Sequence, residues 1–185
     1  MTDGFGGLSH DPPIFSEWVK PAGVMVLLAP HGDGDWVVLV IRRPSTMSEH
    51  ADQLALPGGR FDGRRDRSLW DTAQRETAEE VGIHVPRQWA RGFLAAVFIP
   101  VTAYTILPVV AAAPRRPPVV PGKEVAEWAW VPLGELRQAR RDVPWRLDPN
   151  RLVPEFPLLW GTIWGATGRV LAALLDIMGG GEDAH

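Results

Sequence analysis

The chain has 185 residues, a length that suits one domain with a sizeable hydrophobic core. Its formal net charge of −3 gives no general attraction to nucleic acid, and the absence of cysteine excludes disulfides, thiol nucleophiles and cysteine metal sites. The amino-terminal residues lack the basic and apolar regions of a signal peptide, so we expect a cytoplasmic protein that binds no nucleic acid.

Both ends of the chain are polar and rich in glycine. We therefore expect residues 1–12 to form a flexible amino-terminal tail and residues 179–185 to form a flexible carboxy-terminal tail. Residues 13–178 contain no repeat and no long linker, which predicts a single domain.

The first predicted elements are two short apolar runs, Val24–Leu28 and Trp36–Ile41, joined by the turn-rich spacer HGDGD. This pattern predicts a pair of β-strands. Leu54–Leu56 is a further short strand, and the sequence Pro57-Gly58-Gly59 ends it. Glycines at such a place let the backbone approach a ligand closely.

The clearest predicted helix lies between Ser68 and Gly82. Ser68 is a favourable N-cap with Asp71 at the third helical position, and Gly82 supplies a C-terminal stop. At about 100° per residue, the acidic residues share one face of this helix and the bulky residues occupy another. The acidic residues are Glu76, Glu79 and Glu80.

Further strands and two more helices are expected downstream. The strands lie near Phe93–Ile99, Tyr104–Val110 and Glu127–Val131, and the helices cover Leu133–Arg140 and Gly168–Met178. The longest apolar run, Phe93 to Pro114, is interrupted by Pro100 and Pro108, so it predicts a buried hairpin and no membrane span. Strands with interspersed helices predict an α/β (α+β) fold in which helices cover a mixed β-sheet.

The acidic helix face is the first functional signal. Carboxylates three and four residues apart repel each other on a helix, although a solvated face often tolerates this. Arg75 can pair with Glu79, but no basic residue lies three or four positions after Glu76. Glu76 and Glu80 are then left facing one pocket, and their hard oxygen atoms suit Mg²⁺ or Mn²⁺.

The segment GGRFDGRRDRSLWDTAQRETAEEVGI resembles the Nudix box, which has a glycine, five residues, a glutamate, seven residues and then R-E-U-x-E-E-x-G-U, where U is a bulky aliphatic residue. The matching residues of the second half are Arg75, Glu76, Glu79, Glu80, Gly82 and Ile83. Thr77 replaces the usual aliphatic residue. The first half is two residues longer than the pattern between Gly59 and Arg75, and Asp66 is the acid nearest to the expected glutamate.

The resemblance continues on both sides of the box. RPSTMSEHADQLALPGGRFD is similar to the segment before the box in the coenzyme A pyrophosphatase branch, and WGTIWGATGRVL looks like that branch's WGxTARVL segment. The residues at matching spacings before and within the box are Arg43, Met47, His50, Gln53, Pro57, Gly58, Gly59 and Asp62. Asp52 and Leu56 stand where the branch has glycine and phenylalanine.

The family implies an α/β/α sandwich and attack of water on a phosphorus atom of a diphosphate. By resemblance, Mg²⁺ or Mn²⁺ would be held by Glu76, Glu79, Glu80 and the carbonyl group of Gly59. Arg75 would orient Glu79 or reach Asp66. The general base is left open between Glu79 and Glu124.

Four residues before the box are candidates for substrate binding. Arg42 and Arg43 could grip phosphate oxygens with their guanidinium groups. Gln53 has a structural or substrate-orienting role in this interpretation, and His50 is either a hydrogen-bonded loop residue or a participant in binding.

Three functions follow from the resemblance. The leading hypothesis is hydrolysis of coenzyme A or an acyl-CoA to 3′,5′-ADP and a 4′-phosphopantetheine product. A second keeps the chemistry but acts on ADP-ribose, NADH or a nucleoside triphosphate. The third is a non-catalytic nucleotide sensor, although the three box glutamates are intact here. In each case the partner is a small-molecule diphosphate, and the oligomeric state is open, a homodimer included.

Overall fold

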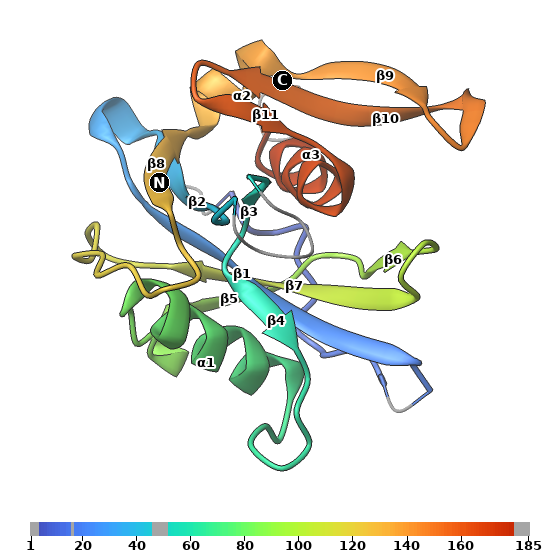
Figure 1. The fold of residues 1–185 in the computed structure, drawn as a ribbon. Coiled ribbons are helices and arrows are strands. Elements are labelled where there is room, and N and C mark those ends of the chain that lie inside the picture. Colours follow the sequence, from blue (N-terminus) through green and yellow to red (C-terminus); the bar gives the residue numbers. More distant parts are fainter. Residues whose placement is uncertain (1–3, 16, 46–51, 180–185) are drawn as a thin grey trace.

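The protein is a three-layer arrangement in which helices cover both faces of a mixed β-sheet (Figure 1). The computed structural model describes residues 4–15, 17–45 and 52–179. The strands of the larger sheet are Lys20–Pro30 (β1), Trp36–Arg42 (β2), Leu54–Ala55 (β3), Gly58–Arg60 (β4), Ala90–Phe93 (β5), Val97–Ile99 (β6), Tyr104–Ala112 (β7) and Glu127–Pro132 (β8). Their order is β3-β2-β1-β7-β5, with β4 on β1, β8 on β2 and β6 on β7.

The central pair of strands makes the sheet mixed. β1 and β7 run parallel, whereas β1 pairs antiparallel with β2 and with β4. Side chains alternate across β1: Met25 and Leu27 belong to one buried cluster, and Val26 and Leu28 belong to the other. The predicted mixed sheet between helices is therefore confirmed.

One face of the sheet is covered by helix α1 (Leu69–Val81), whose ends agree with the prediction. The Ser68 side chain accepts a hydrogen bond from the Asp71 N–H at 3.2 Å, as an N-cap should. Gly82 ends the helix in the left-handed conformation at φ 68°. Leu69, Trp70 and other bulky residues of α1 pack on the sheet.

The opposite face is covered by helix α3 (Gly165–Gly179) and by a second sheet (Figure 1). That sheet consists of β9 (Arg141–Trp145), β10 (Asp148–Leu158) and β11 (Gly161–Ile163), and it follows helix α2 (Leu133–Ala139). Two short 3-10 turns, η1 (Gly32–Gly34) and η2 (Arg87–Trp89), complete the described elements. The second sheet is absent from the sequence-based prediction.

Two predicted boundaries differ from the structure for identifiable reasons. The strand expected over Phe93–Ile99 is divided into β5 and β6, because the break lies beside Pro108 of β7, which has no N–H to donate. The last helix begins three residues before the expected Gly168. This glycine lies inside α3, where an added Cβ would be 2.7 Å from the Pro154 carbonyl oxygen of β10.

The packed part of the chain also begins before residue 13, the boundary expected from the sequence. Phe5 and Leu8 are buried in the core, and Ser9 forms a backbone bridge with Phe93 of β5. At the residues described, no helix is both long enough and apolar enough to cross a membrane.

Candidate active site

The three glutamates of α1 differ in their environment. Glu79 is exposed, Glu76 is half-buried and Glu80 is buried, with 3% of its surface exposed. Their angular positions contribute to this gradient, since Glu80 lies nearest to the helix face that carries Thr77 and packs on the sheet, and strand β4 covers Glu80 further. The acidic face thus reaches from solvent into the protein interior.

Glu80 sits between a backbone N–H group and an arginine. Its Oε2 accepts a hydrogen bond from the Gly58 N–H at 2.9 Å, and its Oε1 lies 3.5 Å from Nη2 of Arg43. Burial raises the pKa of the Glu80 carboxyl to about 7, an effect that Arg43 and the Gly58 N–H only partly offset. A buried carboxyl of this kind favours a nearby cation when it is ionised.

Gly58 and Gly59 bring the backbone against the acidic face. They belong to strand β4, which pairs with β1, so the sequence Pro57-Gly58-Gly59, expected to end one strand, leads directly into the next. A Cβ added to Gly59 would lie 2.5 Å from Cδ of Glu76. The glycine pair therefore allows the β4 main chain to lie beside two carboxylates of α1.

Arg75 is held by a buried aspartate and contacts two glutamates. Its Nε and Nη2 donate to the two carboxylate oxygens of Asp66, and its Nη1 lies 2.6 Å from Glu76 and 3.4 Å from Glu79. The expectation that Arg75 can pair with Glu79 or reach Asp66 is confirmed for both. The absence of a basic residue three or four positions after Glu76 predicts no pairing of Glu76 within the helix, and this is wrong, because Arg75, the preceding residue, pairs with it.

A second arginine, Arg65, was not identified as a site residue from the sequence. Its Nη2 forms a short ion pair with Oε1 of Glu79. The signal in the sequence was the run Arg64-Arg65-Asp66-Arg67, which lies in the loop that is two residues longer than the Nudix pattern. This loop brings a basic side chain to the exposed end of the acidic face.

Glu124 approaches the same region from another segment. The Val120 N–H donates to the Val81 carbonyl and the Gly122 N–H donates to the Glu80 carbonyl, at 2.9 and 2.8 Å. These bonds satisfy carbonyl groups at the C-terminal end of α1, which have no partner within the helix. Glu124 is exposed and close enough for its charge to raise the pKa of Glu80 further.

The candidate substrate-binding residues differ in whether they contact the acidic face of α1. Arg43 joins the acidic face through Glu80, and its N–H donates to the Gln53 carbonyl oxygen at 3.0 Å. The Arg42 guanidinium lies 2.8 Å from Glu127 and 5.6 Å from the ring centre of Trp160. Its planar group is therefore held between a carboxylate and an indole ring. His50 lies outside the described residues.

The oxygen donors suit a divalent cation in their chemistry. Carboxylates and a main-chain carbonyl are the ligand types that Mg²⁺ and Mn²⁺ prefer. Among the described residues, no group of three acidic or histidine side chains is arranged to hold a metal ion. The carboxylates of α1 form ion pairs with arginines instead. The cationic partners show that this face attracts positive charge.

Comparisons with known proteins identify the family. The model of the NUDIX domain matches residues 19–153. The Nudix hydrolase NudL of Pectobacterium atrosepticum is 31% identical over 141 residues, which cover 74% of this chain and 72% of that protein. The peroxisomal coenzyme A diphosphatase ndx-8 of Caenorhabditis elegans is 30% identical over 159 residues, which cover 82% of this chain and 67% of that protein.

A solved structure supports the fold independently. The MutT/nudix family protein from Enterococcus faecalis superposes with a TM-score of 0.62 at 19% identity, over 89% of this chain and 63% of that chain. The sandwich, the glycine pair beside the acidic helix and the matched sequence all agree. The chain therefore belongs to the Nudix family, and it is a diphosphate hydrolase whose substrate is a nucleoside diphosphate derivative.

Proposed function

We propose that this Nudix hydrolase cleaves the diphosphate of coenzyme A or an acyl-CoA to give 3′,5′-ADP and a 4′-phosphopantetheine product. The proposal is supported by similarity to a protein named as a coenzyme A diphosphatase, over most of both chains. It is also supported by the match of Arg43, Gln53 and the Trp160–Leu171 segment to that branch. The observation that carries the site is the buried Glu80 between Gly58 and Arg43.

The proposed metal ligands are the carboxylates of Glu76, Glu79 and Glu80 with the main-chain carbonyl of Gly59. When bound, Mg²⁺ or Mn²⁺ lowers the pKa of a coordinated water and neutralises charge on the phosphates. Ionised Glu80 lies in a buried place where only Arg43 supplies a full positive charge within 4.0 Å, among the described residues. A divalent ion there favours the ionised form of the carboxyl.

Arg75 positions this ligand set. Asp66 fixes one edge of its guanidinium group, and the remaining Nη1 is directed at Glu76 and Glu79. We assign Asp66 the role of the glutamate that the box pattern expects, because its carboxylate holds Arg75. In this role Arg75 acts through the carboxylates that it orients.

Phosphate binding is assigned to Arg43 and Arg42, with His50 and Gln53 as further substrate contacts. Arg43 is the better placed of the two arginines, because it lies beside Glu80, where the diphosphate must meet the metal. Arg42 faces Trp160, which offers a flat apolar surface next to a cation. An adenine ring or the pantetheine arm would fit such a surface.

Glu124 is our choice for the general base. The attacking water forms a new bond to phosphorus, the bridging P–O bond breaks, and the base takes the proton released by the water. Glu124 approaches Glu80 from a separate loop and makes no ion pair within the described chain, whereas Glu79 is held by Arg65 and Arg75. Glu79 is also a proposed metal ligand, which leaves Glu124 to contact the attacking water.

A substrate panel tests the function. Purified full-length protein is incubated with coenzyme A, acetyl-CoA, ADP-ribose, NADH and a nucleoside triphosphate, each with Mg²⁺ and with Mn²⁺, and the products are identified by mass. We expect 3′,5′-ADP from the two coenzyme A compounds at the highest kcat/KM. Faster turnover of ADP-ribose, NADH or the triphosphate would replace the substrate assignment, and binding without turnover under either metal would show a sensor.

A further inference from the structure

Both carboxylate oxygens of Glu79 are paired with arginines. Oε1 forms a short ion pair with Nη2 of Arg65, and Oε2 lies 3.4 Å from Nη1 of Arg75. Glu79 is also one of the proposed metal ligands, so a metal ion that binds it must replace one of these guanidinium groups. The two arginines therefore compete with the metal for the same carboxylate.

The two arginines differ in how firmly they are held. Arg75 donates two hydrogen bonds to the buried Asp66, and only 15% of its side chain is exposed. The side chain of Arg65 is 53% exposed, and in the described part of the chain its guanidinium group pairs with Glu79 alone. Ion pairs between exposed side chains contribute little to stability. Arg65 is therefore the arginine that a metal ion displaces from Glu79.

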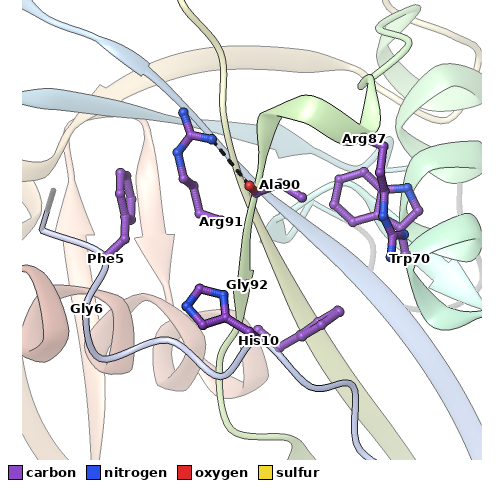
Figure 2. Close-up of a pocket in the computed structure, with 9 residues that line it drawn as sticks. Phe5, Gly6, His10, Trp70, Arg87, Ala90, Arg91 and Gly92 are labelled. Atoms are coloured by element: carbon purple, nitrogen blue, oxygen red, sulfur yellow. Dashed lines mark hydrogen bonds between the residues drawn. The ribbon is translucent and has the colours of Figure 1, made fainter.

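Aromatic rings hold other arginines of this protein but not Arg65. Figure 2 shows Arg87 beside Trp70, with 4.7 Å between the guanidinium carbon and the ring centre. Such a contact stabilises a guanidinium group that has no anionic partner. No ring of the described residues lies in this way against Arg65. Once it leaves Glu79, the guanidinium group of Arg65 needs another anion.

The main chain around Arg65 is fixed, although its side chain is exposed. The Asp62 carbonyl oxygen accepts from the N–H groups of Arg65 and Asp66, at 2.9 and 2.7 Å. The Asp62 carboxylate accepts from the Arg64 N–H at 3.0 Å, and the Asp62 N–H donates to Asp66 at 3.0 Å. The Arg65 side chain can therefore change its partner while its backbone stays beside the exposed end of the acidic face.

A phosphate oxygen on the metal would lie within easy reach of this side chain. Two oxygens bound to one Mg²⁺ are at most about 4 Å apart, because each lies about 2.0–2.1 Å from the ion. A diphosphate on a metal ion that Glu79 coordinates thus has an oxygen within about 4 Å of that carboxylate. Arg65 already reaches the carboxylate, and guanidinium groups bind phosphate oxygens with paired, charge-assisted hydrogen bonds.

We propose that Arg65 is a substrate-binding residue that exchanges Glu79 for a phosphate oxygen of the diphosphate when the metal binds. This inference rests on the proposed function, which supplies the metal and the diphosphate. Without metal, Arg65 neutralises Glu79. With metal and substrate, the same side chain adds a positive charge to the phosphates, next to the ion.

Metal affinity, measured without any phosphate, is the first test. Mn²⁺ is titrated into full-length protein and the free ion is measured by electron paramagnetic resonance. Arg65→Ala should bind Mn²⁺ at least threefold more tightly than the unmodified protein, because the competing guanidinium group is gone. Arg64→Ala is the matched control, since it removes the same charge from the same loop and Arg64 is exposed, with only its main-chain N–H bonded. Its affinity should stay within twofold.

Affinity for a diphosphate analogue should change in the opposite direction. The probe is methylenediphosphonate, whose P–C–P bridge is not hydrolysed, at a Mg²⁺ concentration that saturates each variant. Calorimetry should show at least tenfold weaker binding to Arg65→Ala and a change of less than twofold for Arg64→Ala. Arg65→Lys keeps the charge but loses the paired donors, so its affinity should lie between the two. A purely structural role of Arg65 would lower both affinities together.

The proposal is overturned if Arg65→Ala leaves either affinity unchanged, if it weakens Mn²⁺ binding, or if Arg64→Ala has the same effects. The midpoint of urea unfolding verifies that each variant is folded. Failure of the proposed function looks different. Absence of Mn²⁺ binding to the unmodified protein would refute the metal site and this exchange with it, whereas coenzyme A that is not hydrolysed would leave both binding results as they stand.

Discussion

Arg75 donates two parallel hydrogen bonds to Asp66, from Nε to Oδ1 at 2.8 Å and from Nη2 to Oδ2 at 2.9 Å. The Asp66 side chain is only 1% exposed, and it also accepts from the Asp62 N–H and the Thr72 hydroxyl. Burial alone would raise the pKa of Asp66, but the hydrogen bonds from Arg75 and these neighbours hold it below its usual range. Asp66 is thus an ionised anchor for the arginine that reaches Glu76 and Glu79.

Asp66→Asn should destabilise the protein, because it leaves the Arg75 guanidinium without its buried counter-charge. We expect the free energy of unfolding, measured by urea denaturation, to fall by about 3 kcal/mol. Turnover should fall as well, since Glu76 and Glu79 lose their oriented partner. Glu135→Gln, on the exposed side of α2, is the control and should change neither quantity. Equal stability of the two variants would show that the Asp66–Arg75 pair does not hold this loop.

Gly59→Ala should lower activity while the fold is kept. The added Cβ would be 2.5 Å from Cδ of Glu76, so the flexible glutamate side chain must move away from the proposed metal position. We expect kcat/KM to fall at least tenfold and the midpoint of urea unfolding to change little. Gly63→Ala is the matched control, because its Cβ would meet only the Phe61 ring at 3.4 Å. A Gly59→Ala enzyme as active as Gly63→Ala would contradict the contact.

The raised pKa of Glu80, about 7, predicts a pH dependence of stability in metal-free buffer. Between its unfolded pKa, about 4.3, and its folded pKa, the folded state retains a proton that the unfolded state releases. The free energy of unfolding should therefore decrease as the pH rises through this window, by roughly 4 kcal/mol at most.

Glu80→Gln isolates this contribution, because a glutamine can still accept from the Gly58 N–H but does not titrate. Its stability advantage over the unmodified protein should grow between pH 5 and about pH 8. Mg²⁺ should raise the unfolding temperature of the unmodified protein more than that of the variant. A stability difference that does not vary with pH would show that Glu80 is ionised throughout.

The general base can be distinguished by two matched substitutions. If Glu124 accepts the proton, Glu124→Gln should lower kcat by about 10²- to 10⁴-fold with little change in KM. Glu79→Gln should weaken the dependence on Mg²⁺ concentration, because it removes a proposed ligand. Steady-state kinetics over a metal titration measure both effects. A fully active Glu124→Gln enzyme would transfer the role of base to Glu79.

The parts of the fold that the sequence predicts are those with local signals. Ser68 and Gly82 mark the ends of α1 correctly, because capping depends on residues next to the helix. β9 and β10 were missed, because most of their residues are exposed and show no alternation of buried and polar positions. β10 also contains Pro149, Pro154 and Pro157, which are disfavoured within sheets.

In the site, too, the sequence predicts only contacts between residues that are close together in the chain. Spacing along the helix predicted the Arg75–Glu79 pair, which is one turn apart. The Arg65–Glu79 and Arg43–Glu80 pairs join residues that are distant in the sequence, so they depend on how a loop and a strand meet the helix. The burial of Glu80 could not be read from its helical angle alone, because it depends on β4 lying beside it.

The loop that carries Glu124 is joined to the end of α1 by peptide groups rather than by side chains, through the Val120 and Gly122 N–H groups. A Cβ at Gly122 would lie 2.5 Å from the Glu79 carbonyl oxygen, so this junction tolerates little change, whereas residues 114–116, upstream of it, are exposed. Insertions in that upstream stretch would leave Glu124 in the same position relative to the end of α1, because the Val120 and Gly122 N–H groups fix the intervening segment. The chain therefore tolerates a change of length at residues 114–116 that it does not tolerate at the Gly122 junction.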